Sequence, residues 1–280
     1  MMKKLFLIGL SIFLIFGIAG TFLWFTVNNK YEKQESFEKV FQNNQIDQII
    51  VNGQNTDVEV KQGNTLKLKY EGNHDVNANV ENKLLHFSEH NKKFTFNANF
   101  IPFRKTKNTL TITLPKKQYE AFNITTNTGN IVLSDVNSDN SNMITETGKI
   151  TYHNVDMKHA KAMSDLGNIH VNQSNLTEFN GELDTGNIFV ENSRLVNSEL
   201  LTNIGNIDVD DLKNECNIKS SIEDGNLTIS YAKKPKDTLL QLHAESGKKR
   251  ILNKEFSDEK VGPGNHVIEG YTDKGDITIE

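Results

Sequence analysis

The segment HFSEH, residues 86–90, is the part of this sequence closest to a catalytic motif. One class of zinc peptidase uses this pattern, with a helix that presents both imidazoles and a glutamate that serves as the base. Here the surrounding residues, NKLLHFSEHNKKFTF, alternate in polarity as a strand and turn do. His86 and His90 would then lie ~13 Å apart, too far for one zinc ion. We therefore expect an exposed hairpin and no metal site.

No other combination of side chains has the spacing of a reactive site. Cys216 is the only cysteine, so an intramolecular disulfide is excluded, and we expect an inert, partly buried thiol. The remaining histidines are scattered along the chain. An enzyme that cleaves polysaccharide needs two carboxylates at a defined separation in a cleft, and no such pair stands out. We expect no catalytic residue, no metal site and no cofactor.

The charge balance argues against one class of partner. The chain has 31 Lys and Arg against 36 Asp and Glu, a formal net charge of -5. Domains that bind nucleic acid carry a basic patch or stripe that faces the phosphates. We therefore expect no nucleic-acid partner.

Glycines recur at a nearly constant interval through the second half of the chain. The gaps between them are 19, 19, 19, 19, 20, 22 and 28 residues, and the longer gaps look like loop insertions. These turn glycines are Gly129, Gly148, Gly167, Gly186, Gly205, Gly225, Gly247 and Gly275. Apolar residues stand two and four positions after nearly every glycine, which predicts a short strand with one face in a core. Lys249 breaks the pattern at the first inward position after Gly247.

A repeat this short cannot enclose its own apolar face, so neighbouring repeats must stack. Stacked strands lie ~4.8 Å apart, so eight coils would form a rod of roughly 38 Å. Glycine suits the tight corner because it accepts positive φ. Asparagines follow most of the glycines and could share hydrogen bonds along the stack, with a break at Lys149. We predict an all-β fold over residues 116–280: a single-stranded β-solenoid, or β-helix, with rungs of about 19 residues.

A different pattern precedes the repeats, over residues 46–115. The segments DVEV (57–60), TLKLKY (65–70), FTFNANF (94–100) and TLTITL (109–114) alternate in polarity and are separated by Gly, Asn and Asp turns. Such segments are typical of half-buried antiparallel strands. We predict an antiparallel β-strand region that Pro115 ends.

The amino terminus has the composition of a membrane anchor. Residues 5–27 are uncharged and largely apolar, and as a helix they would span roughly 34 Å, enough for a hydrocarbon core of ~30 Å. We predict a cytoplasmic tip at 1–4, a transmembrane helix at 5–27 and a juxtamembrane spacer at 28–45. Lys3 and Lys4 favour a cytoplasmic amino end, so most of the chain would be extracytoplasmic. A cleaved signal peptide and a buried soluble helix are the alternatives.

Acidic or amide residues stand two positions before each turn glycine. If the coils stack in register, these residues line one edge at ~4.8 Å intervals. The acidic members are Glu146, Asp165, Asp184, Glu223, Glu245 and Asp273, and Asn127 and Asn203 complete the row. Asp and Asn at such positions often serve turn chemistry alone. The alternative is an acidic edge that binds cations or a cationic polymer.

The chain ends on the strand DITIE, residues 276–280, with no helix after it. An open final coil would expose unpaired backbone groups, which charged side chains often guard. We expect such guarding, and the alternatives are end-to-end self-association or pairing with a partner strand.

The strand TLTITLP, the following FNITTNTGNIVLSDV and the repeated T-x-x-GNI-x-V rungs resemble the DUF4097 family of bacterial adhesins. The resemblance covers Ile46 to Glu280, and an amino-terminal anchor is similar to many members. It implies a β-solenoid of the cell envelope and no catalytic residues. Some members sit beside regulatory systems for envelope stress.

We therefore expect a non-enzymatic, membrane-anchored protein whose solenoid serves as an interaction or adhesion surface. Its partners would be the membrane and a cell-wall polymer or another envelope protein. The alternatives are a self-assembling scaffold, an envelope-stress sensor or regulator, and, last, a β-helix enzyme that acts on polysaccharide.

Overall fold

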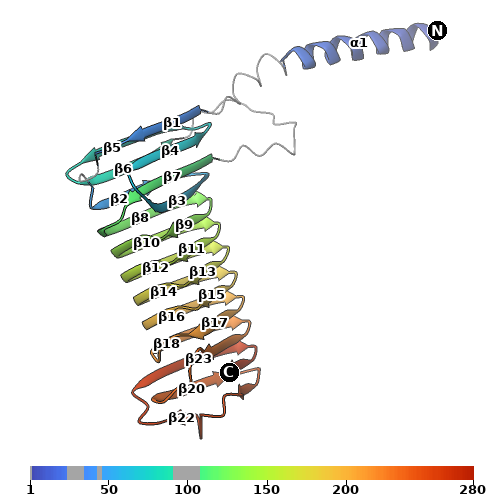
Figure 1. Cartoon of the computed structure of the whole chain (residues 1–280). Helices are drawn as coiled ribbons and strands as arrows, with labels where there is room; N and C mark the ends of the chain where they lie inside the picture. The colour runs from blue at the N-terminus through green and yellow to red at the C-terminus, as the bar shows by residue number, and fades with distance from the viewer. Residues whose placement is uncertain (1, 24–34, 43–45, 91–107) are drawn as a thin grey trace.

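The protein is a stack of β-coils preceded by one helix, α1 (Met2–Leu23) (Figure 1). The computed structural model describes residues 2–23, 35–42, 46–90 and 108–280. Within these ranges the strands form two sheets of 12 strands each, and nearly all neighbours are parallel. Buried aliphatic and aromatic side chains between the two sheets make one continuous core.

The first sheet contains the short strand of each repeat and is called the short-strand sheet. Its order is β1 (Glu35–Val40), β4 (Lys67–Gly72), β7 (Asn108–Pro115), β3 (Thr56–Gly63), β9 (Ile131–Ser134), β11 (Ile150–His153), β13 (Ile169–Asn172), β15 (Ile188–Glu191), β17 (Ile207–Leu212), β19 (Leu227–Tyr231), β24 (Ile277–Ile279) and β21 (Lys249–Ile251).

The second sheet contains the long strand of each repeat and is called the long-strand sheet. Its order is β22 (Lys260–Val261), β20 (Thr238–Ala244), β23 (His266–Lys274), β18 (Asn217–Asp224), β16 (Arg194–Ile204), β14 (Asn175–Thr185), β12 (Asp156–Leu166), β10 (Asn137–Thr147), β8 (Gln118–Thr128), β2 (Gln48–Asn52), β6 (Leu84–His90) and β5 (Asp75–Glu81).

Each repeat is one coil, which confirms the predicted solenoid but not its single-stranded rung. A coil of the regular stack contributes an 11-residue strand to one sheet and a 4-residue strand to the other, as β10 and β11 do. The two predicted inward rows, such as Ile150 and Tyr152, are no more than 1% exposed. The long strand escaped prediction because β10 reads NSDNSNMITET, in which small polar residues fill most inward positions.

The turn glycines stack in one file, as predicted, and the main reason is close backbone approach. A Cβ at each of these glycines would lie far closer than 3.0 Å to a backbone carbonyl of the adjoining coil, such as that of Gly148 at Gly167. Within the file of turn glycines, only Gly186, Gly205, Gly225 and Gly275 adopt positive φ, between 143° and 154°. Positive φ, the reason expected from the sequence, therefore applies to half of the file.

A second corner of each coil also needs an unusual backbone, and the sequence did not predict it. Five residues, each six positions after a turn glycine, have φ between 49° and 58°, in the left-handed region. They are Asp135, Asn154, Gln173, Asn192 and Asp211. Asn and Asp tolerate this region better than other non-glycine residues, which explains why they dominate the corner.

The predicted asparagine column is confirmed, including its break. The Asn168 Oδ1 accepts the backbone N–H of Asn187 at 2.8 Å, and Asn187 and Asn206 repeat the contact to the next coil at 2.7 and 2.9 Å. Lys149 lacks an acceptor side chain, so the column is interrupted there. Aspartates continue the column at both ends, where Asp57 accepts from Asn130 and Asp276 from Lys248.

The predicted antiparallel region, 46–115, has both parallel and antiparallel pairs and already belongs to the stack. β2 and β3 form a coil that lies between the β6–β7 coil and the β8–β9 coil, with parallel pairing on both sides. Among the described residues of this part of the chain, the antiparallel pairs are β1 with β4, β4 with β7, and β5 with β6. Alternating polarity does not distinguish strand direction, which explains the error. The predicted strand FTFNANF lies outside the described residues.

The carboxyl-terminal coils stack out of sequence order, so the predicted open end is wrong. β24 pairs with β19 on one side and β21 on the other, and Gly275 lies between Gly225 and Gly247 in the file. The last coil of the stack is therefore β20–β21, with β22 antiparallel to β20. Lys249 is exposed at this end, where its Nζ lies 2.7 Å from Glu259.

Within the described part of the chain, no helix combines the length and apolar character needed to cross a membrane. The expected span, 5–27, continues past the end of α1 into residues outside the described ranges. The expected spacer, 28–45, includes β1, which pairs with β4.

We expect Gly167→Ala to lower the free energy of unfolding by about 3 kcal/mol or more, because the new Cβ must displace the Gly148 backbone and the adjoining coil. Urea unfolding followed by circular dichroism measures the loss. Gly181→Ala is the control, since its Cβ would lie 3.2 Å from the Phe179 ring, which can shift. Equal losses in both variants would contradict the close-approach explanation.

We expect Lys149→Asn to raise the free energy of unfolding by about 1 kcal/mol, because the new Oδ1 would accept the Asn168 backbone N–H and close the gap in the column. Lys149→Gln removes the same charge with an acceptor one methylene farther out and serves as the control. A gain of the same size in both variants would assign the effect to charge.

Candidate functional site

The residues of the H-x-x-E-H segment lie on β6, which forms the predicted hairpin with β5, but one face of β6 is buried. His86 faces outward, and its Nε2 lies 3.2 Å from the Nδ2 of Asn52. Glu89 faces inward with Leu85 and Phe87 and is only 4% exposed. Among the described residues, no three His, Cys, Asp or Glu are grouped so that they could hold a metal ion.

The Glu89 carboxylate is the centre of a buried hydrogen-bond network. One oxygen, Oε2, accepts the backbone N–H of Gln54 at 2.6 Å and that of Asn55 at 3.2 Å. The other, Oε1, is 2.7 Å from Thr56 Oγ1, 2.7 Å from His74 Nδ1, 3.1 Å from Asn108 Nδ2 and 3.3 Å from the Tyr70 hydroxyl. Glu89 thus fixes the corner between β2 and β3, where the turn-glycine file begins at Thr56.

The surroundings of Glu89 favour its ionised form. Burial raises the pKa of the carboxyl, but the hydrogen bonds from Gln54 and Thr56 and the charge of His74 outweigh it and hold the pKa below its usual value of 4.5. Both oxygens are occupied by donors, so the carboxylate has little capacity left for base catalysis. Its role is structural, and the sequence contained the signal, because Glu89 shares the inward phase of Leu85 and Phe87.

A groove runs along the outer face of the long-strand sheet, and we treat it as the candidate binding site. It consists of two adjoining hollows of about 670 and 520 Å³ that share Glu178 and Asn180. We call it the amide groove because seven of its lining residues are asparagines: Asn123, Asn140, Asn142, Asn180, Asn197, Asn217 and Asn265. This groove was not predicted from the sequence, although several of these asparagines recur at the coil interval.

Two rows of outward side chains form the walls of the amide groove. In one row Asn140, His159, Glu178, Asn197 and Asn217 are neighbours from coil to coil. In the other row the neighbours are Asn123, Asn142, Lys161, Asn180, Glu199, Lys219 and Glu269. Buried residues between the rows, such as Ser141 and Ala160, contribute the floor.

Charges in the amide groove are largely paired with one another. His159 Nδ1 lies 2.7 Å from Glu178 Oε2, and Lys219 Nζ lies 3.1 Å from Glu199 Oε1. Two polar atoms of the lining are buried without a hydrogen-bond partner in the described part of the protein, Asn180 Oδ1 and Ser198 Oγ. The groove is therefore polar but nearly neutral, with these two atoms left for a partner from outside.

The predicted acidic edge lies on the coil corner, next to the turn glycines. Glu146, Asp165, Asp184, Glu223 and Glu245 are exposed, and Asp273 is half-buried. Asp273 accepts a hydrogen bond from Tyr271, which together with the charge of Asp273 raises the pKa of Tyr271. The paired strands on either side keep the row in register, with Glu245 after Asp273 because the last coils are exchanged. Cation binding at this edge stays a prediction.

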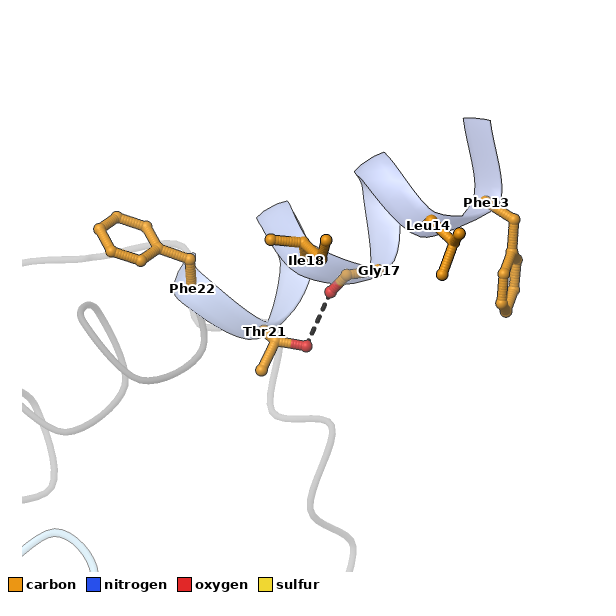
Figure 2. Close-up of a pocket in the computed structure, with 6 residues that line it drawn as sticks. All are labelled: Phe13, Leu14, Gly17, Ile18, Thr21 and Phe22. Atoms are coloured by element: carbon orange, nitrogen blue, oxygen red, sulfur yellow. Dashed lines mark hydrogen bonds between the residues drawn. The ribbon is translucent and has the colours of Figure 1, made fainter. Parts of the chain in front are cut away.

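Helix α1 presents apolar side chains in every direction. Phe13 and Phe16 are each 73% exposed, and Phe22 is 67% exposed. Figure 2 shows one stretch of this surface, a shallow hollow of about 460 Å³ between Phe13 and Phe22. The polar group of Thr21 is satisfied within the helix, because its Oγ1 donates to the Gly17 carbonyl at 2.7 Å. Such internal bonding suits apolar surroundings.

Comparisons with known proteins agree with this architecture. The profile of a family described as Toastrack DUF4097 matches residues 46–280. A crystal structure from Parabacteroides distasonis, provisionally named a lipid-binding protein, shares 15% identity with a TM-score of 0.51, over 89% of this chain and 97% of that one. One from Bacteroides fragilis, provisionally named an adhesin, shares 13% identity with a TM-score of 0.48, over 89% and 99%. No curated protein matches.

We expect Glu89→Gln to lower the free energy of unfolding at pH 7 by about 3 kcal/mol, because it replaces a buried acceptor with a group that also carries an N–H₂ donor. The stabilisation by ionised Glu89 is present above pH 4.5, its usual pKa, and is lost as the pH falls through the lower folded-state value. The variant should therefore lose less stability on acidification than the parent protein.

Urea unfolding at pH 7 and at pH 3 to 4 measures both effects. Glu120→Gln is the control, because Glu120 is an exposed carboxylate that accepts one hydrogen bond from Gln48, at 2.7 Å. Equal acid sensitivity in Glu89→Gln and the parent protein would contradict the assignment.

Proposed function

The chain belongs to the Toastrack DUF4097 family, and from that premise we propose that it is a non-enzymatic, membrane-anchored protein of the bacterial cell envelope. The stack of coils would lie outside the cytoplasm and present an interaction surface. The observation that carries this proposal is the amide groove, which follows successive coils of a stack whose core is continuous.

The rigidity of the stack supports a display function. Each regular coil is bonded to its neighbours through both sheets, through the asparagine column and through the turn corner. A surface built this way keeps its side chains at fixed spacing without ligand present, so little conformational entropy is lost on binding. Solenoids generate such extended binding faces from short repeats.

The composition of the amino terminus supports the anchor. The large apolar side chains of α1 are exposed in every direction, and the hydrocarbon of a lipid bilayer is the surrounding that would bury them all. Lys3 and Lys4, before the apolar run, would stay on the cytoplasmic side. The coils, which follow in the sequence, would then be extracytoplasmic.

The chemistry of the carboxylates favours binding over catalysis. Glu89 is saturated by donors, and two of the three acids of the amide groove, Glu178 and Glu199, pair with basic side chains of the same groove. A polysaccharide-cleaving pair needs one carboxyl with a raised pKa beside one that stays ionised. In the groove, Glu178 and Glu199 each lie against a basic side chain instead, His159 and Lys219.

Assembly through open coil ends has less support than the sequence suggested. The final strand of the chain lies between two others, and the last strand of the short-strand sheet, β21, is only three residues long and carries Lys249 and Arg250. Short, charged edges discourage strand addition.

We expect a photoreactive residue at Asn142, in the amide groove, to crosslink to an envelope component in intact bacterial cells. The same residue at Thr151, on the outer face of the short-strand sheet, is the matched control and should give little product. Gel shifts and mass spectrometry identify the adducts. The full chain should fractionate with membranes, and a chain without residues 2–27 should not.

Equal crosslinking from both positions would contradict a groove-specific interaction. Recovery of the full chain in the soluble fraction would contradict the anchor and leave the crosslinking result to be judged separately.

A further inference from the structure

We propose that the amide groove binds a neutral, linear glycan, with amide contacts from the coils that line it except that of β12, which presents His159 and Lys161. The inference deepens the proposed function by naming the ligand class of the same surface, and it rests on that function for its setting in the envelope. Four properties of the groove carry it: length, hydrogen-bonding groups, charge and an aromatic end.

The length and periodicity of the groove fit an extended polymer. Its lining residues come from seven successive strands of the long-strand sheet, from β8 to β23. Six steps of ~4.8 Å give a track of roughly 29 Å. The step is close to the length of one sugar ring in an extended glycan, so equivalent side chains of successive coils meet successive rings.

The hydrogen-bonding groups fit hydroxyl-rich rings. An amide side chain both donates and accepts, as sugar hydroxyls do, so the two groups satisfy each other in pairs. Some groove amides already accept: Asn197 Oδ1 accepts from Asn217 Nδ2 at 2.9 Å, and Asn217 Oδ1 accepts from the Val267 N–H at 3.0 Å. Asn180 Oδ1 and Ser198 Oγ are the exceptions among the described lining residues, and a ligand hydroxyl could supply a partner to either atom.

The charges of the groove exclude strongly charged polymers. His159 pairs with Glu178 and Lys219 with Glu199, which leaves Lys161 and Glu269 as single charges of opposite sign. A polyanion would meet the three glutamates without a continuous basic track, and a polycation would find no continuous acidic one. A neutral chain avoids both costs.

An aromatic pair lies beside the carboxyl-terminal end of the groove, outside its lining residues. The rings of His243 and Tyr271 are stacked, with centroids 5.3 Å apart and an interplanar angle of 10°. Tyr271 is 40% exposed and stands two residues after Glu269 on the same outward phase of β23. The aliphatic face of a sugar ring packs on an exposed aromatic ring, so this pair would hold the last ring of the track.

The test measures binding of neutral linear hexasaccharides of glucose, N-acetylglucosamine and mannose to the full chain in detergent micelles by isothermal titration calorimetry. A hexamer of galacturonic acid is the charged comparison. We expect saturable binding of at least one neutral glycan and none of the acidic one. Asn180→Ala and Tyr271→Ala should each weaken the association constant about tenfold, the equivalent of 1.4 kcal/mol.

Thr151→Ala, on the opposite sheet, is the matched control and should leave binding unchanged. Melting temperatures confirm that each variant folds. No saturable binding of any neutral hexasaccharide at millimolar concentration, preference for the acidic glycan, or insensitivity to both groove substitutions overturns the proposal. A groove-specific crosslink to a protein in cells, without glycan binding in vitro, would sustain the proposed function and discard the glycan.

Discussion

The close approach of two backbones at the glycine corner is the constraint on which the stack depends. The carbonyl oxygen of one corner occupies the space that the next corner would need for a Cβ, so the coils reach sheet spacing there only if the side chain is absent. The same carbonyls accept hydrogen bonds from buried hydroxyls, as from Thr145 to Gly129 at 3.1 Å and Ser164 to Gly148 at 3.2 Å. This corner fixes the register of both sheets, and the aliphatic rows, the asparagine column and the groove walls follow from that register.

The parts of the fold that the sequence predicted are those in which one residue type is required at one place. Only glycine fits the corner, and only an acceptor side chain continues the column past Asn168. The long strands were not predicted because small residues such as Ser141 and Ala160 occupy buried inward positions of these strands. Large aliphatic residues at those positions would have made the alternating pattern visible in the sequence. The order of the last coils was missed because strand pairing over 50 residues, as between Ile218 and Ile268, has no local signal. The structural role of Glu89 was not predicted, because the segment was interpreted as an exposed hairpin and the inward phase of Glu89 was not used.

Both ends of the stack show how a solenoid avoids an open edge. At the amino-terminal end the β6–β7 coil precedes the β2–β3 coil in space, and antiparallel β4 and β5 cover it. At the other end β20–β21 lies beyond the last coil in sequence. A carboxylate fixes each rearrangement. Glu89 binds the backbone of the β2–β3 corner, and Glu215 accepts from Lys236 N–H at 2.7 Å and Thr238 Oγ1 at 2.9 Å, before β20. The exchanged coils thus terminate the sheets where uniform repetition would leave them open.

The regular coils between these ends are the ones that a repetitive ligand could use. The four equal gaps of 19 residues place Asn140, His159 and Glu178 in one row without insertion, and the two hollows of the amide groove meet there, at Glu178 and Asn180. Each contact between a coil and a sugar ring adds a modest amount to the free energy of binding. Once one ring is bound, the next ring contacts the next coil within the same complex, so its binding is favoured. Affinity would then grow with ligand length, so a chain polymer would be retained where a single sugar would dissociate.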